Sequence, residues 1–276
     1  MTTPINVDSH PLDVILRSDR IPHIWCPGCG IGIAMRCYAQ AILDSGIPRD
    51  DHVLISGIGC SGRVAGYMKI DSYHTTHGRA IPFAVGLKLA NPELTVSVFS
   101  GDGDLAAIGG NHLIHAARRN VDISVICANN FNYGMTGGQL GPTTPFGART
   151  TTSPYGSPEL PFNFPYLLAA SGANFVARWT TIHVRQLKRD ILYMFSKPGF
   201  SFVEVLVPCP VGFGKMNYID KGLDEMLLYK ERCVIADGTP IDELGIDLRA
   251  DQPIYVGRFV DRDLAPYQPV RLEDIE

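Results

Sequence analysis

The sequence lacks the features that would place a protein in or across a membrane. None of its apolar runs approaches the ~20 residues that a helix needs to cross a bilayer. Its first residues also lack the basic and then apolar layout of a secretory signal peptide. We therefore expect a cytoplasmic protein with no membrane partner.

The sequence also has little excess charge of either sign. It carries 24 Lys and Arg against 28 Asp and Glu, a formal net charge of −4. Without a basic field, a protein has no general electrostatic attraction for nucleic acid, so no nucleic-acid partner is expected. With 45% hydrophobic and 19% charged residues, the 276-residue chain is globular and long enough for one large α/β unit.

What the sequence does have is an alternation of strand and helix patterns. Buried strands are predicted at residues 53–55, 95–100, 123–128, 174–177 and 202–207. Helices are predicted after Gly30 and at residues 79–90, 104–118, 184–194 and 223–236. This alternation predicts parallel β-α-β units, so the expected fold class is α/β with a doubly wound, mostly parallel sheet.

Three segments follow from this pattern. Residues 1–25 are expected to form an N-terminal arm and residues 26–215 the main domain. Residues 216–276 are expected to form a helix and an extended, proline-punctuated tail that suits contact with another subunit. Within the main domain, residues 129–165 are rich in Gly, Thr, Pro and Asn. So long a stretch is expected to lie beside a functional site.

The strongest local signal is Gly101-Asp102-Gly103-Asp104, which directly follows one predicted strand, and Asn130, which follows the next. The carboxyl ends of parallel strands meet at one edge of a sheet, where open α/β sheets bind ligands. Carboxylate, amide and carbonyl oxygens suit a hard divalent cation, and glycines before a helix N-terminus suit a diphosphate. The sequence therefore predicts a cation and diphosphate site, with an ordinary Asp-Gly turn as the alternative.

Residues 57–62 also fit the G-x-G-x-x-G pattern of a dinucleotide site. That interpretation requires a helix to open there and an acidic residue ~20 positions further on. Instead, Cys60 lies inside the turn and Pro82 falls in the later region. A nicotinamide site is therefore the weaker alternative.

Several stretches are more specific motifs: Cys26-Pro27-Gly28-Cys29-Gly30, residues 57–62, His74-Thr75-Thr76-His77-Gly78-Arg79, residues 109–112 and residues 133–139. With the Gly101-Asp102-Gly103 and Asn130 motif of thiamine diphosphate enzymes, they resemble the β subunit of 2-oxoacid:ferredoxin oxidoreductases over residues 20–215. The resemblance implies that Mg²⁺ is held by Asp102, Asn130 and the carbonyl of Asn132. It implies a thiamine diphosphate pocket lined by Ile58, Gly59, Cys60, Ser61, His77, Gly103, Asp104, Gly134 and Met135.

The same resemblance gives four of the seven cysteines a role. It implies a [4Fe–4S] cluster held by Cys26, Cys29, Cys60 and Cys209, and four thiolates are what such a cluster needs. The cysteines alone would fit structural zinc equally well. The remaining three thiols are expected to be small buried side chains: Cys37, Cys127 and Cys233.

The resemblance implies an oxidoreductase that converts a 2-oxoacid and coenzyme A into acyl-CoA and CO₂ while reducing ferredoxin, or the reverse. The chain shows no glutamate placed to activate thiamine diphosphate. In the family, that residue lies on an α subunit with the pyrimidine-binding domain, so a lone β chain should be inactive. Further γ and ferredoxin-like δ subunits are expected partners.

The loop from Asn129 to Pro145 looks most like the branch of the family that prefers 2-oxoglutarate. Arg149, the one basic residue of segment 129–165, is a candidate partner for a distal carboxylate, and the α subunit is the other source. Pyruvate and branched-chain 2-oxoacids stay open. A non-oxidative thiamine diphosphate decarboxylase or synthase would share Asp102 but would not need four cluster cysteines. A zinc-binding module would need neither Asp102 nor Asn130.

Overall fold

The structure is a computed structural model that describes residues 10–219, 221–249 and 252–269. Within them, eight strands form one sheet in the order β2-β1-β3-β4-β8-β7-β10-β9. All neighbouring pairs are parallel except β10 with β7, which confirms the predicted α/β, mostly parallel sheet. The strands are β1 (His52–Ser56), β2 (Asp71–His74), β3 (Thr95–Gly101), β4 (Ser124–Asn129), β7 (Phe175–Thr180), β8 (Ser201–Leu206), β9 (Cys233–Ile235) and β10 (Ile254–Asp261).

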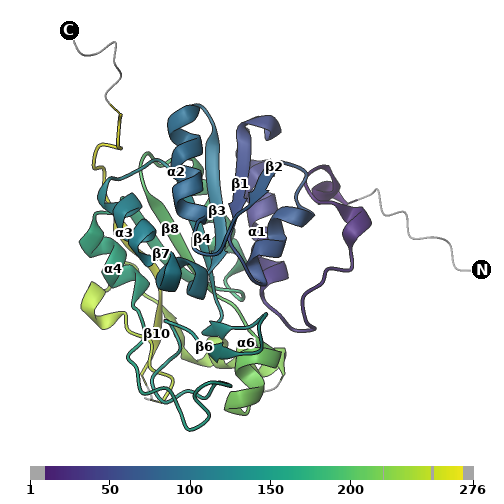
Figure 1. Ribbon diagram of the computed structural model, residues 1–276, viewed down its shortest axis with the longest axis vertical. Coiled ribbons are helices and arrows are strands. Elements are labelled where there is room, and N and C mark those ends of the chain that lie inside the picture. The colour runs from purple at the N-terminus through teal and green to yellow at the C-terminus, as the bar shows by residue number, and fades with distance from the viewer. Residues whose placement is uncertain (1–9, 220, 250–251, 270–276) are drawn as a thin grey trace, which may run out of the picture.

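Helices cover both faces of this sheet (Figure 1). One layer contains α1 (Ile31–Asp44) and α5 (Val184–Ser196); the other contains α2 (Ala80–Ala90), α3 (Gly110–Arg118) and α4 (Phe164–Ser171). Side chains alternate along a strand, so Val125 and Cys127 of β4 face one layer while Ile126 and Ala128 face the other. The predicted continuous apolar runs are therefore strands buried on both sides.

Several elements differ from the sequence prediction. The predicted helix 104–118 begins with a π-helical turn, Asp104–Ile108, before α3. The predicted helix 223–236 is too long, because α6 (Gly222–Arg232) is followed directly by β9. Neither α4 nor the edge strand β2, whose four residues are all exposed, was predicted from the sequence.

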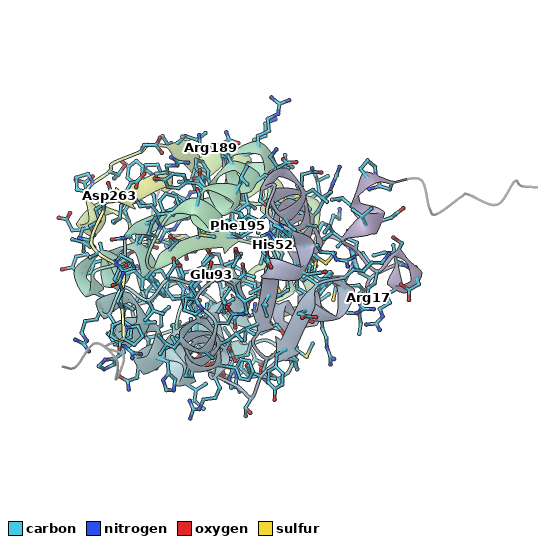
Figure 2. The ribbon with its side chains drawn as sticks, turned by 90° about the horizontal axis from the view of Figure 1, so that it is seen from above. Arg17, His52, Glu93, Arg189, Phe195 and Asp263 are labelled. Carbon is cyan, nitrogen blue, oxygen red and sulfur yellow. The ribbon has the colours of Figure 1, made fainter. Side chains whose placement is uncertain are left out.

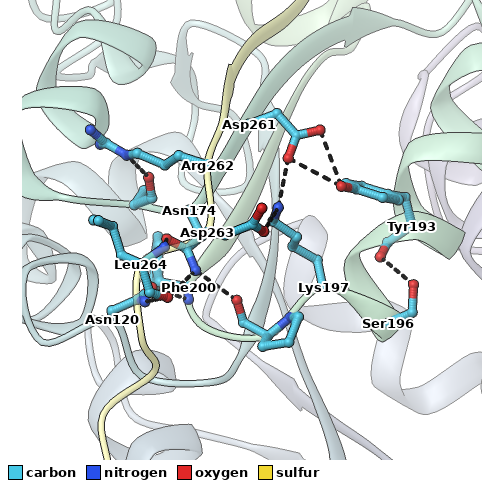
Figure 3. Close-up of polar contacts among 12 residues, drawn as sticks. Asn120, Asn174, Tyr193, Ser196, Lys197, Phe200, Asp261, Arg262, Asp263 and Leu264 are labelled. Atoms are coloured by element: carbon cyan, nitrogen blue, oxygen red, sulfur yellow. Dashed lines mark hydrogen bonds and ion pairs between the residues drawn. The ribbon is translucent and has the colours of Figure 1, made fainter.

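Within the tail that was expected to contact another subunit, residues 254–261 form β10 in the sheet. From the last residue of β10 onward, residues 261–267, here called the C-terminal strap, pack across the start of β7 and β8 (Figure 3). Lys197 donates to the carboxylates of Asp261 and Asp263, and Asn174 donates to the carbonyl of Leu264. The described part of the tail therefore belongs to the fold, and residues 270–276 lie outside the described residues.

The N-terminal arm is also partly built into the molecule. Its residues 10–25 form two 3₁₀ turns, Pro11–Val14 and Ser18–Arg20, and bury Leu12, Ile15 and Trp25 in the layer that contains α1. Seen from above, Arg17 on this arm and Asp263 on the strap lie at opposite sides of the molecule (Figure 2). No helix in the described residues is long and apolar enough to span a membrane.

Candidate active site

One cavity of about 190 Å³ lies at the carboxyl edge of β1, β3 and β4. These strands are neighbours and parallel, so the loops that follow them meet there. The cavity is lined by all of the residues predicted from the resemblance to bind thiamine diphosphate and magnesium: Ile58, Gly59, Cys60, Ser61, His77, Asp102, Gly103, Asp104, Asn130, Asn132, Gly134 and Met135. Sequence positions far apart in the chain thus meet at one site, as predicted.

Glycine is required at two points of this wall. Gly59 has a φ of +100°, a left-handed conformation that side chains other than glycine rarely adopt. Gly103 has an ordinary φ, but a Cβ there would overlap the ring of Tyr133, which also lines the cavity. The loop and the ring can approach this closely only because the side chain is missing.

Three oxygens gather at the floor of the cavity. The Asn130 amide lies against Oδ1 of Asp102 and the carbonyl oxygen of Asn132: with its nitrogen toward them it donates over 3.2 and 2.7 Å, and with its oxygen toward them three oxygens meet at one point. In an octahedral magnesium site with bonds of ~2.1 Å, neighbouring oxygens lie about 3.0 Å apart. The donor set and the spacing therefore fit a small, hard divalent cation.

Asp102 is almost completely buried, at 1% exposure. Burial raises the pKa of its carboxyl to about 6, although hydrogen bonds from Thr143 and from the backbone NH of Asn130 oppose the rise. A carboxylate kept in so dry a place needs a positive partner to be stable in its ionised form. A bound cation would supply that charge.

Asp104 has a different task, because protein donors occupy both of its carboxylate oxygens. Oδ2 accepts a hydrogen bond of 2.7 Å from Ser100, and Oδ1 accepts one of 2.9 Å from the NH of Gly78 and one of 3.3 Å from the NH of Ile58. Oδ1 also contacts Nδ1 of His77. Asp104 therefore fastens the loops that carry Ile58 and His77 to the end of β3, and its side chain is not free to bind a ligand.

A second cavity of about 110 Å³ adjoins the first and is lined by the four predicted cluster cysteines: Cys26, Cys29, Cys60 and Cys209. Cys60 lines both cavities. Burial raises the pKa of Cys29 to about 12 and that of Cys60 to about 11, and neighbouring cysteines add to both shifts. A positively charged iron core would offset these shifts and stabilise Cys29 and Cys60 as thiolates.

No three Cys, His, Asp or Glu side chains in the described residues are close enough to hold a single metal ion. A single zinc ion would have to contact all of its ligands at once. In a four-iron cluster, each cysteine binds a different iron.

Two hydrogen bonds hold the backbone around the cysteine cavity, and they come from residues that were not predicted from the sequence. The indole NH of Trp25 donates to the carbonyl of Cys60 over 2.7 Å, and the NH of Cys209 donates to Oε2 of Glu225 over 2.9 Å. Glu225 is 2% exposed, and burial raises its pKa to about 7. It lies on α6, outside the stretch that carries the resemblance, so no motif indicated it.

The other candidates lie away from the two cavities. Cys37 and Cys127 are buried as predicted, whereas Cys233 is only partly buried. Arg149, predicted as a candidate for a distal carboxylate, is exposed and donates to the hydroxyl of Tyr218 over 2.7 Å. It does not line the cofactor cavity, and among the described residues no Lys or Arg does.

Comparisons with known proteins agree with this geometry. Residues 57–205 match the family model described as thiamine pyrophosphate enzyme, C-terminal TPP binding domain. The 2-oxoglutarate synthase subunit KorB of Methanocaldococcus jannaschii is 52% identical over 225 residues, covering 82% of this chain and 83% of that protein. The protein of the same name from Archaeoglobus fulgidus is 47% identical and covers 88% of this chain and 86% of its own length.

A more distant relative and a solved structure extend the match. The 2-oxoglutarate oxidoreductase subunit KorB of Mycobacterium tuberculosis is 35% identical, covering 87% of this chain and 72% of that protein. The solved structure is a 2-oxoglutarate:ferredoxin oxidoreductase from Magnetococcus marinus with 2-oxoglutarate, coenzyme A and succinyl-CoA bound. It superposes with a TM-score of 0.82 and 29% identity, covering 95% of this chain and 89% of that one.

Proposed function

Because this chain belongs to the β subunits of 2-oxoacid:ferredoxin oxidoreductases and carries their thiamine diphosphate-binding domain, we propose that it forms the magnesium, diphosphate and iron–sulfur half of a 2-oxoglutarate-oxidising active site. The observation that carries this proposal is the pair of adjoining cavities. One is lined by the predicted cofactor residues and the other by the four predicted cluster cysteines.

The residues of this chain divide the work of binding. Asp102, Asn130 and the carbonyl of Asn132 hold Mg²⁺, and the glycine turns and His77 receive the diphosphate. Thiamine diphosphate supplies an electron sink for loss of CO₂ from a 2-oxoacid, and the cluster supplies a one-electron acceptor beside it. Cys60 lines both cavities, so two cofactors bound there would be neighbours. Such proximity favours oxidation of the substrate over simple decarboxylation.

The site is incomplete in this chain. No glutamate lines the cofactor cavity in the described residues. Thiamine chemistry needs a glutamate beside the aminopyrimidine ring, so an α subunit that brings one is part of the proposal. That subunit would also cover the open side of the cavity, and γ and ferredoxin-like δ subunits would complete the assembly. Coenzyme A accepts the acyl group, and ferredoxin takes the electrons.

The proposed substrate is 2-oxoglutarate, because the relatives that match over most of the chain carry that name and the solved neighbour has 2-oxoglutarate bound. Its distal carboxylate needs a cationic partner in a site from which water is excluded. The described lining of this chain offers none, and Arg149 is engaged by Tyr218. The partner subunit is therefore the proposed source of that cation, and Arg149→Gln should leave the KM for 2-oxoglutarate within about twofold.

Iron content tests the cluster directly. We expect about four iron atoms and four acid-labile sulfides per chain in the anaerobically purified complex with its partner subunit. Cys26→Ser should lower both values, because Cys26 lines the cysteine cavity, whereas the matched control Cys233→Ser should leave them unchanged. Zinc in place of iron, or no metal in the wild-type complex, would return the assignment to a non-oxidative thiamine diphosphate enzyme.

The same complex separates the candidate substrates. Reduction of ferredoxin or a viologen dye is measured with coenzyme A and with 2-oxoglutarate, pyruvate or a branched-chain 2-oxoacid. The proposal expects the highest kcat/KM with 2-oxoglutarate. Without an electron acceptor, formation of acyl-CoA is not expected, because oxidation of the substrate must transfer two electrons to an acceptor.

A further inference from the structure

A buried hydrogen-bonded network lies behind the proposed magnesium site, on the side away from the cavity. It contains Asp102, Thr143, Asn129, Glu204 and Arg178, none of which is more than 2% exposed. The network crosses four neighbouring strands or their ends, since Arg178 lies on β7, Glu204 on β8, Asn129 at the end of β4 and Asp102 just after β3. Only Asp102 was predicted from the sequence.

The network starts from a buried ion pair. Nε of Arg178 donates to Oε2 of Glu204 over 2.7 Å, which gives this carboxylate the countercharge that a buried anion needs. The other oxygen, Oε1, accepts a hydrogen bond of 2.7 Å from the amide nitrogen of Asn129. An amide has one donor end and one acceptor end, so the pair with Glu204 forces the Asn129 oxygen to face the active-site loop.

That oxygen organises the loop that carries two of the proposed ligands. It accepts the backbone NH of Phe131 over 3.1 Å. Phe131 has a φ of +63°, a conformation that is unfavourable for a bulky side chain and needs support from its surroundings. Phe131 lies between Asn130 and Asn132. The turn at Phe131 brings the side chain of Asn130 and the carbonyl of Asn132 to the same point.

Thr143 connects the same amide to the third ligand. Its hydroxyl lies 3.1 Å from Oδ1 of Asn129 and makes a short contact with Oδ2 of Asp102. The hydroxyl has one proton, and an ionised carboxylate is the stronger acceptor. A hydrogen bond to Oδ2 leaves Oδ1 of Asp102 directed toward Asn130.

We propose that Glu204, Asn129 and Thr143 are positioning residues that preset the three ligand oxygens for the divalent cation, while Arg178 keeps Glu204 in place. None of the four lines the cofactor cavity. The inference rests on the proposed magnesium site and adds to it the part of the fold that fixes its geometry. Groups behind metal ligands typically change metal affinity by about 10–100-fold when they are altered.

The test measures Mn²⁺ as a substitute for Mg²⁺. Binding is followed by the EPR signal of free Mn²⁺ in the anaerobically purified complex at saturating thiamine diphosphate. Thr143→Val keeps the volume and removes the hydroxyl, and Glu204→Gln removes the charge that orients Asn129. Both should raise the Kd for Mn²⁺ by about 10–100-fold. Thr143→Ser keeps the hydroxyl and should stay within about threefold of wild type.

A matched control separates positioning from stability. Asp190 is another fully buried carboxylate of this fold, paired with Arg258 over 2.6 Å and bonded to the indole NH of Trp179. Asp190→Asn should lower Tm without changing the Kd for Mn²⁺. Glu204→Gln should raise the Kd for Mn²⁺. Its Tm is measured as well, so that the Kd values of the two variants are compared at a known loss of stability in each.

Two outcomes would overturn the inference, and they differ from failure of the metal site itself. Wild-type Kd values in Thr143→Val, or Kd changes in Asp190→Asn that equal those in Glu204→Gln, would show that the network is only structural. Asp102→Ala is the reference in the same assay. If Asp102→Ala also binds Mn²⁺ like wild type, the proposed magnesium site is wrong, and with it the role of the network.

Discussion

Buried asparagines have different hydrogen-bond partners at the two edges of the parallel strands. At the amino edge, Asn120 and Asn174 use both ends of their amides: each donates to the carbonyl of Leu264, and their oxygens accept the NH of Phe200 and of Leu264 (Figure 3). At the carboxyl edge, the Asn130 amide lies against Oδ1 of Asp102 and the carbonyl of Asn132: its nitrogen donates to both in one orientation, and its oxygen faces both in the other. The amino edge is therefore closed by the protein itself, whereas one turn of an amide at the carboxyl edge directs three acceptors toward a cation.

This difference separates structural polar groups from binding ones. Buried polar groups are normally paired, because an unpaired one costs about 1–3 kcal/mol. Where the turn of one amide exchanges internal hydrogen bonds for three oxygens at one point, a cation can replace those hydrogen bonds. Burial and residue type are similar at the two edges, so neither property would distinguish them.

The largest effect is expected at the carboxyl edge. Asp102→Ala should weaken magnesium-dependent binding of thiamine diphosphate by at least about 100-fold, because it removes the charged ligand. Without cofactor, the variant should unfold at the same temperature as wild type or higher, since burial raises the pKa of Asp102 to about 6 and disfavours its charge. Tryptophan fluorescence titration and calorimetry measure the two quantities. Unchanged cofactor affinity would contradict the assignment of the site.

The reverse pattern is expected at the amino edge. Asn174 is 1% exposed and donates to the carbonyls of Pro198 and Leu264, both over 2.8 Å. Asn174→Ala should therefore reduce the free energy of unfolding by about 2–3 kcal/mol, because it leaves buried groups unpaired. Its affinity for thiamine diphosphate should stay within about twofold of wild type.

Asn130→Ala is the matched variant for this comparison, since it makes the same substitution at the other edge. It should lose cofactor binding and keep most of its stability in urea unfolding. Equal losses of stability in the two variants would mean that Asn130 serves the fold as Asn174 does, and the contrast between the edges would disappear.

Much of the carboxyl edge could be predicted from the sequence, because its residues come in short motifs. The glycines of residues 57–62 and Asp102 stand directly after a strand, the paired Cys26 and Cys29 stand just before α1, and their neighbours along the chain carry the signal. Strand β10 could not be predicted in this way. It enters the sheet by pairing with β7, about 80 residues earlier in the chain, and local periodicity does not report so distant a partner.

The positioning network was missed for the same reason. Thr143, Glu204 and Arg178 are separated in sequence and meet only because β4, β8 and β7 are neighbours in the sheet. A glutamate inside an apolar strand was the one available sign, since buried carboxylates are rare unless paired. The sequence does not say with which group such a residue pairs.

His52 is an exception at the amino edge, because it is a buried polar side chain with an unpaired atom. It begins β1, is fully buried beside Phe195 (Figure 2), and its Nδ1 has no hydrogen-bond partner. Its Nε2 lies 3.2 Å from the hydroxyl of Ser45. If unpaired buried groups outside a binding site simply cost stability, this ring should make the fold sensitive to acid.

Burial lowers the pKa of His52 to about 4 from the ordinary value of 6.5, although nearby Asp51 opposes the shift. Below pH 6.5 the unfolded chain therefore takes up a proton at this residue, while the folded protein does not until about pH 4. Stability must then fall as the pH is lowered through this window. From pH 7 to pH 5, His52 should cost about 2 kcal/mol of folding free energy.

His52→Phe removes the titrating group and keeps an aromatic ring against Phe195. Urea unfolding of both proteins between pH 7 and pH 5 should give curves that diverge toward acid, with the wild type losing about 2 kcal/mol more than the variant. Parallel curves would mean that the folded protein accepts the proton at His52 as readily as the unfolded chain does. The imidazole ring would then be more accessible to water than its burial implies. The idea that unpaired buried polar atoms at the amino edge only reduce stability would be wrong.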